Sequence, residues 1–208
     1  DVEVVSPAVI TGKYAEETAT SLTPIIKPYT TWQEGERYRI YSTDDLRKNA
    51  NANGYYEIYA DLDFNNTEWP SVFSGGKFSG KIFGKGHTIS NVTIESNTRG
   101  RIGYGLFASL DGAYIENLTF ENITHTVDLM DVAQGATIGL LAGSVGEGSS
   151  FKNVKISGKL LFTDNCIDLV SKSDSFSIGL IAADGDVSGI SFEAGEVTAE
   201  KVNSKNEE

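Results

Sequence analysis

The sequence has one cysteine, two histidines and four prolines among 208 residues. A single cysteine excludes an internal disulfide, and together with two histidines at unrelated spacing it cannot form a zinc site. No apolar run approaches the roughly 20 residues that cross a bilayer. No signal peptide is recognisable, yet the chain starts at Asp1. We therefore expect a processed or trimmed product, from which any upstream signal or lipid-attachment segment is missing.

Basic residues are also few. Lys and Arg number 17 against 29 Asp and Glu, which gives a net charge of −12 and a pI near 4.6. No cluster of basic residues is dense enough to neutralise a phosphate backbone. The sequence predicts that nucleic acid is not a partner.

Glycine is abundant instead, with 22 residues, and Thr, Ser, Asn, Ile and Phe are frequent. This composition is typical of many short strands joined by tight turns. The length suits one sizeable core. We expect an all-β protein with a single core.

A six-residue motif recurs, and a second motif precedes each copy. The first reads ISNVTI from Ile89, IENLTF from Ile115, FKNVKI from Phe151 and VSGISF from Val187. The second reads GLFASL from Gly105, GLLAGS from Gly139 and GLIAAD from Gly179, with a looser counterpart, FSGKIFG, from Phe78. Conserved order with variable intervening segments is typical of stacked supersecondary units.

Each copy of the first motif is apolar at its first, fourth and sixth places, whereas a regular strand would alternate. The extra residue predicts a corner at the third place, which is Asn91, Asn117, Asn153 and Gly189. Asn and Gly accept a left-handed backbone most readily, so we expect a positive φ there.

Two asparagines also begin glycosylation-type triplets, Asn117-Leu-Thr119 and Asn122-Ile-Thr124. A glycan acceptor is one interpretation. We favour a corner role for Asn117, in an amide ladder with Asn91 and Asn153. The fifth place of the motif would then point outward, at Thr93, Thr119, Lys155 and Ser191.

The resulting fold prediction is a right-handed parallel β-helix over residues 78–192, with an inward ladder of Val92, Leu118, Val154 and Ile190. Residues 36–77 should hold a short capping helix, with Ser42 or Thr43 as N-cap, and a first partial coil. Residues 1–35 should be an extension or edge strand, and residues 193–208 a solvated tail.

The segments YEIYADLDF, FSGKIFGKGHTISNVTI, GYGLFASLDGAYIENLTF and IGLLAGSVGEGSSFKNVKISG resemble GLUG-type repeats over roughly residues 38–192. Such repeats occur in bacterial cell-surface proteins, including adhesin-like proteins of gut bacteria and non-catalytic regions of streptococcal IgA-cleaving metalloproteases. The resemblance implies a secreted or surface-anchored bacterial protein. It carries little information on activity.

Catalysis is the alternative that the sequence supports least. His87, in GKGHTIS, would suit a polysaccharide-cleaving β-helix, but Asp44-Asp45 falls in the predicted helix and no Asn-x-Asp lies on a predicted coil strand. His87 and His125 are 38 residues apart, so no His-Glu-x-x-His zinc helix exists. Cys166 is interpreted as a packed side chain.

Two further patterns are interpreted as structural, not functional. The segment DLDFNNTE resembles a calcium loop but lacks its glycine and its twelfth-position acid, which favours outward acids on a strand. Trp32, Trp69, Tyr55, Tyr56 and Tyr59 crowd the N-terminal third, and we expect them mainly to pack.

The sequence therefore predicts a monomeric, non-catalytic module of an extracellular surface protein, with no cofactor and no catalytic, cofactor-binding or metal-ligating residues. Its ligand would be a glycan or a host or matrix protein. The variable return segments, ENITHTVDLMDVAQGAT and GKLLFTDNCIDLVSKSDSFS, are the expected binding face. The alternatives are a passive spacer in a larger surface protein and, less favoured, a polysaccharide-cleaving enzyme.

Overall fold

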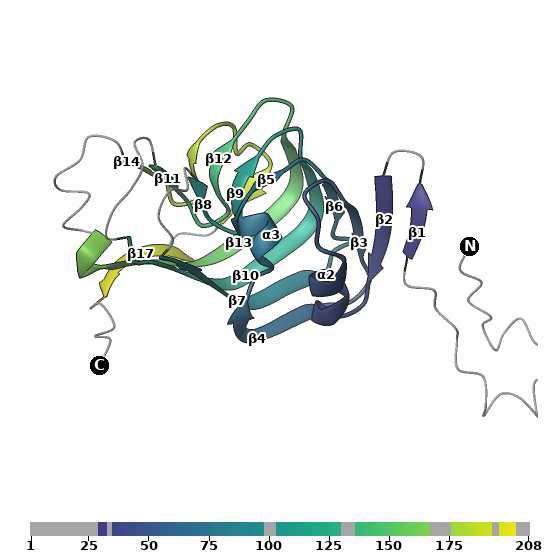
Figure 1. Cartoon of the computed structure of the whole chain (residues 1–208), viewed down its shortest axis with the longest axis horizontal. Coiled ribbons are helices and arrows are strands. Elements are labelled where there is room, and N and C mark those ends of the chain that lie inside the picture. The colour runs from purple at the N-terminus through teal and green to yellow at the C-terminus, as the bar shows by residue number, and fades with distance from the viewer. Residues whose placement is uncertain are drawn as a thin grey trace, which may run out of the picture.

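The computed structural model describes residues 29–32, 35–97, 103–129, 136–166, 176–192 and 196–202. Strands dominate these residues and helices are few, which confirms the all-β prediction (Figure 1). The strands form three sheets in this part of the chain. Their pairings are parallel, apart from one antiparallel pair at the N-terminal edge.

The largest sheet carries the longest strands. Its order is β1-β2-β3-β6-β10-β13-β16, with β17 added to β13, β7 added to β10, and β4 added to β7. The bounds are β1 Tyr29–Trp32, β2 Gly35–Ile40, β3 Tyr55–Ile58, β4 Leu62–Glu68, β6 Lys81–Phe83, β7 Thr88–Ser96, β10 Tyr114–Val127, β13 Ser150–Thr163, β16 Ile190–Ser191 and β17 Val197–Val202.

The two smaller sheets are formed by short strands. One has the order β15-β12-β9-β5 and the other β14-β11-β8. Their strands are β5 Lys77–Phe78, β8 Gly103–Tyr104, β9 Phe107–Leu110, β11 Ala136–Ile138, β12 Ala142–Val145, β14 Phe176–Ile178 and β15 Ala182–Asp184.

The chain visits these three sheets in the same order three times. It runs through β8, β9 and β10, then β11, β12 and β13, then β14, β15 and β16. One passage pairs with the next in parallel, so that Tyr114 lies opposite Ser150, 36 residues later. In Figure 1 the long strands β10 and β13 curve side by side beneath the short strands of the other sheets.

Two short helices lie near the beginning of the described chain. Helix α2 spans Thr43–Asn49, and its N-cap is Ser42, whose Oγ accepts a hydrogen bond from the Asp45 amide at 3.1 Å. This confirms the predicted helix and its cap, and Leu46 is its buried anchor. Helix α3, Ser71–Ser74, was not predicted and buries Phe73. None of the helices in the described residues has the length and apolar character that crossing a membrane requires.

Aromatic rings from separate parts of the chain meet in the interior. Phe73 lies 5.4 Å from Phe78 and 5.8 Å from Phe107, measured between ring centroids. Trp69 lies 5.4 Å from Phe73 and meets Phe120 edge-on at 6.4 Å. These rings link α3 to both the large sheet and a small sheet in one core.

The predicted corner positions have the predicted backbone. φ is 53° at Asn91, 49° at Asn117, 51° at Asn153 and 86° at Gly189. Asn153 Nδ2 donates to Asn117 Oδ1 at 3.0 Å, which is one step of the predicted amide ladder. The amide of Asn117 is therefore engaged at a corner.

Asn91 corrects the rest of that ladder. Ile89 lies opposite Phe120 rather than Ile115. Accordingly, Asn91 Oδ1 accepts from Asn122 Nδ2 at 2.6 Å, and Asn91 Nδ2 donates to Asp63 Oδ1 at 2.8 Å. The first copy of the motif, ISNVTI, therefore lies beside the corner at Asn122 and not beside the corner at Asn117.

The inward ladder changes for the same reason. Leu118 lies opposite Val154, and Val154 lies opposite Ile190, as predicted. Val92, however, pairs with Thr67 of β4, so it is buried in another row.

The ends differ in part from the expectations. Residues 193–208, expected to be a solvated tail, contribute strand β17, which pairs with β13 and buries Val197. Within residues 1–35, β1 forms the antiparallel edge strand, and residues 1–28 lie outside the described residues. The return segments begin as continuations of β10 and β13, while their loops at 130–135 and 167–175 also lie outside the described residues.

Candidate ligand-binding face

The outward side of the large sheet near its N-terminal edge carries aromatic and charged side chains. Strand alternation produces this face: Tyr38 and Tyr56 are buried inward, while Arg37 and Tyr55 point outward. We name it the Tyr55 face. It comprises Arg37, Arg39, Tyr55, Glu57, Lys81, Phe83, Tyr114, Glu116 and Lys152.

The parallel register sorts these side chains into two rows across the strands. Arg37, Tyr55, Lys81 and Tyr114 lie opposite one another in one row. Arg39, Glu57, Phe83, Glu116 and Lys152 form the other row. Between the rows is an open hollow of about 310 Å³, whose lining includes Tyr55, Glu57, Lys81, Phe83 and Lys85. We call it the Tyr55 hollow.

Glu57 organises the cations of this face. Its side chain is only 6% exposed and contacts the guanidinium of Arg37. Arg39 Nε and Lys85 Nζ each lie 3.9 Å from a Glu57 carboxylate oxygen. The hydroxyl of Tyr59 donates to the same carboxylate at 3.0 Å. A buried carboxylate with these partners is held in place and in turn holds three cations.

Aromatic rings complete the lining. Lys81 Nζ lies 4.9 Å above the centroid of the Tyr55 ring, and Lys85 Nζ lies at the same distance from the Tyr59 ring. These are cation–π distances. Phe83 and Tyr114 pack with ring centroids 5.9 Å apart.

The far side of the hollow is closed by Glu116. The hydroxyl of Tyr114 donates to Glu116 Oε2 at 2.8 Å, and this hydrogen bond is the main reason why the pKa of Tyr114 is raised. Lys152 Nζ lies 3.8 Å from the same carboxylate oxygen. Glu116 is therefore already engaged by its neighbours.

The aromatic residues singled out in the sequence divide between two roles. Tyr56 and Trp69 are buried, as expected for packing. Tyr55 and Tyr59 are on the outer surface, and Tyr59 is 37% exposed. The side chain of Trp32 lies outside the described residues.

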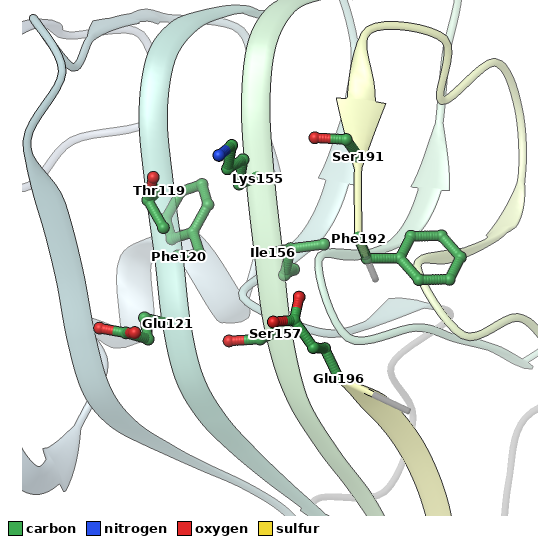
Figure 2. A pocket seen from close by; sticks show the side chains of 9 residues that line it. All are labelled: Thr119, Phe120, Glu121, Lys155, Ile156, Ser157, Ser191, Phe192 and Glu196. Carbon is green, nitrogen blue, oxygen red and sulfur yellow. The ribbon is translucent and has the colours of Figure 1, made fainter. Parts of the chain in front are cut away.

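A second hollow, of about 390 Å³, lies where β10, β13 and β16 run together (Figure 2). Figure 2 shows Thr119, Lys155 and Ser191 on three adjacent strands, and they are outward-facing as predicted. Phe192, 48% exposed, lies at its edge. This Phe192 hollow contains one lysine and two glutamates, and it lacks the stacked rows of the Tyr55 face.

The two histidines considered for catalysis or metal binding, His87 and His125, lie in different surroundings. His87 Nδ1 lies 3.1 Å from Asp61 at the surface, and His125 is buried in the interior. The Thr88 amide and then His87 lower the pKa of Asp61 by hydrogen bonding. Among the residues that the structure describes, no group of three His, Cys, Asp or Glu side chains could hold a metal ion.

The calcium-like segment DLDFNNTE and Cys166 have the structural roles expected from the sequence. Asp61 and Asp63 are exposed beside the buried Leu62 and Phe64, as expected for outward acids on a strand. Cys166 is buried, and desolvation raises the pKa of its thiol to about 11. A thiol that stays protonated at neutral pH is a poor nucleophile.

Comparisons with known proteins give one informative likeness. The chain is 28% identical over 183 residues to Halomucin of Haloquadratum walsbyi, a match that covers 79% of this chain and 2% of Halomucin. The chain thus spans a very small part of the length of that relative. No protein-family model matches the chain, and no solved structure matches it.

Proposed function

We propose that this chain is a non-catalytic, glycan-binding module of an extracellular surface protein, built as a right-handed parallel β-helix. Support for the β-helix comes from the repeated order of the three sheets and from the parallel pairing of segments 36 residues apart. The right-handed sense follows from the strong preference of parallel crossovers. Helix α2 caps the N-terminal end of the coils.

The observation that carries the function is the Tyr55 hollow. Aromatic rings and hydrogen-bonding charged groups meet there in an outward-facing depression of about 310 Å³. Pockets for small ligands begin at about 300 Å³ and combine apolar surfaces with a few placed polar groups. A sugar ring offers an apolar C–H face for an aromatic ring and hydroxyls for the charged groups, so it fits this combination.

The carboxylates of the face support binding over catalysis. Glycoside cleavage requires two carboxylates free to act as acid and as base or nucleophile. Glu57 is 6% exposed and surrounded by three cations and the Tyr59 hydroxyl. Glu116 accepts from Tyr114 and faces Lys152. Both groups serve to position their neighbours.

Two likenesses support the cell surface as the location. The sequence resembles GLUG-type repeats of bacterial surface proteins, and it is similar to Halomucin of Haloquadratum walsbyi. We propose that the chain belongs to an anchored surface protein that mediates adhesion.

A glycan array tests this proposal, with host and matrix proteins printed on the same surface. We expect saturable glycan binding by the purified chain, lost in Tyr55→Ala and retained in Phe192→Ala, which changes an exposed ring at the other hollow. An absence of binding to every glycan on the array would overturn the proposed glycan-binding function. Glycan binding that Tyr55→Ala leaves intact would overturn the site.

A further inference from the structure

The Tyr55 face has the opposite charge to the molecule as a whole. The chain has a net charge of −12, with 17 basic residues. Five of these lie on or beside this face, namely Arg37, Arg39, Lys81, Lys85 and Lys152. Among the side chains that the structure describes there, the acids are Glu57 and Glu116. A locally cationic hollow on an acidic protein focuses the field on one spot and attracts anions to it.

One buried carboxylate, Glu57, faces three of these cations, Arg37, Arg39 and Lys85. It is also 6% exposed, so it lies behind the cations and not in front of them. The Nε of Arg39 is buried without a hydrogen-bond partner. The lining of the hollow itself contains three cations, Arg37, Lys81 and Lys85, against two carboxylates, Glu57 and Glu116.

Lys81 is the side chain best placed to meet a ligand. It lines the Tyr55 hollow, and its ammonium lies 4.9 Å above the Tyr55 ring. Across the described part of the chain, no carboxylate lies within ion-pair distance of Lys81. Among the described residues, no carboxylate therefore competes with a ligand for the three N–H donors of the Lys81 ammonium.

We infer that the Tyr55 hollow binds an acidic sugar, one that bears a carboxylate or sulfate group. The inference rests on the proposed glycan-binding function and adds the ligand's charge to it. The sugar ring packs against Tyr55, and its anionic group accepts hydrogen bonds from Lys81 and Lys85. Glu57 is a positioning residue, because it contacts the ligand only through the cations that it holds.

A nucleic acid is a weaker match for the same charge. Binding a phosphate backbone uses a basic stripe that follows successive phosphates. Here the cations surround one hollow, and the rest of the chain carries an excess of acids.

Titration calorimetry with the purified chain tests the inference. The probes are a uronic-acid hexasaccharide, a sulfated hexasaccharide, a neutral hexasaccharide of the same linkage, and a single-stranded hexanucleotide. We expect at least one acidic sugar to bind about tenfold more tightly than the neutral one, since it adds a charged hydrogen bond that the neutral sugar cannot form. Added salt should reduce this preference.

Variants separate the charge effect from the ring contact. Lys81→Gln should abolish the preference for the acidic sugar while weak neutral-sugar binding remains. Lys155→Gln, which removes the lysine of the Phe192 hollow, should leave the preference unchanged.

Equal affinity for acidic and neutral sugars, with both lost in Tyr55→Ala, would overturn the inference and leave the glycan-binding function standing. An absence of binding to any sugar would overturn both. Hexanucleotide binding as tight as that of the acidic sugars would also overturn the inference.

Discussion

At the scale of single residues, His125 is the most unusual buried group. Its side chain is fully buried, Nδ1 donates to the Gly139 carbonyl at 3.1 Å, and Nε2 accepts from the Ser96 hydroxyl at 2.8 Å. Burial lowers the pKa of His125 from 6.5 to about 4. The imidazole is therefore neutral in the folded protein at physiological pH and satisfies both hydrogen bonds as a neutral ring.

We expect this histidine to make stability depend on pH. Its pKa is lower in the folded than in the unfolded chain, so the unfolded chain binds more protons between pH 6.5 and about 4. The contribution is fully present above pH 6.5 and is lost as the pH falls toward 4, with a limit of about 3 kcal/mol. Urea unfolding at a series of pH values measures it.

The matched variants are His125→Gln and His87→Gln. The first should flatten the pH dependence between pH 6.5 and 4.5, because the buried titrating group is gone. The second changes a surface histidine and is the control for replacing a histidine by glutamine outside the core. Identical slopes in the parent chain and both variants would show that His125 does not cause the effect.

The corner residues show what single positions reveal in the sequence. Asn and Gly alternate at the third place of the motif because both tolerate a positive φ, and Asn117, Asn153 and Gly189 have it. Their hydrogen-bond partners could not be predicted, because these depend on register. Asn91 has the same backbone but pairs with Asn122 and Asp63.

At the scale of elements, strand β10 explains that error. It contains two corners in succession, IENLTF from Ile115 and FENITH from Phe120, and each is apolar at the first and fourth places. Their central asparagines, Asn117 and Asn122, both have a positive φ. ISNVTI resembles both segments, so self-similarity alone cannot say which one it joins. Parallel pairing places it beside the second.

The inward side of β10 provides a test of the packing. Leu118 is 1% exposed and lies opposite Val154, so Leu118→Asp would bury an unpaired charge. We expect a loss of more than about 4 kcal/mol and no cooperative unfolding transition. Circular dichroism during thermal unfolding would detect this change.

Thr119→Asp is the matched control, because the neighbouring side chain points outward into the Phe192 hollow. It should keep a melting temperature within a few degrees of the parent chain. A cooperative transition in Leu118→Asp at the temperature of the parent chain would mean that this row does not face the core.

The candidate binding face was accessible to sequence reasoning only in part. Alternation in YYEIY predicts that Tyr55, Glu57 and Tyr59 share one side of a strand. The neighbouring strands come from segments outside the four copies of the motif, with Arg37 and Lys81 on either side of Tyr55. No local sequence pattern predicts that these strands pair. The cations and aromatic rings are therefore seen to lie together only in the folded chain.

At the scale of the whole molecule, composition was sufficient for the all-β class, whereas charge distribution was not. The net charge of −12 suggests a uniformly acidic surface. Folding instead gathers Arg37, Arg39 and Lys85 around one buried carboxylate. A sum over residues contains no information about such a cluster.

This charge imbalance leads to a prediction about salt. Repulsion among the excess acids opposes the compact state, and salt screens it. We expect the melting temperature to rise by a few degrees between about 0.02 and 0.5 M NaCl. Scanning calorimetry measures the change, with sucrose of equal osmolality as the control. A melting temperature that falls with NaCl would show that attractive ion pairs outweigh the repulsion.

The repeated passage through the three sheets also has a mechanical consequence. Successive passages are hydrogen-bonded to one another, and Tyr114 and Ser150, 36 residues apart, mark one such step. Tension between the two ends would peel off one passage at a time. Each would release a length of chain on the order of 120 Å before the next began to yield. Such a chain lengthens in stages under load, and the remaining passages keep their pairing while the first ones absorb the pull.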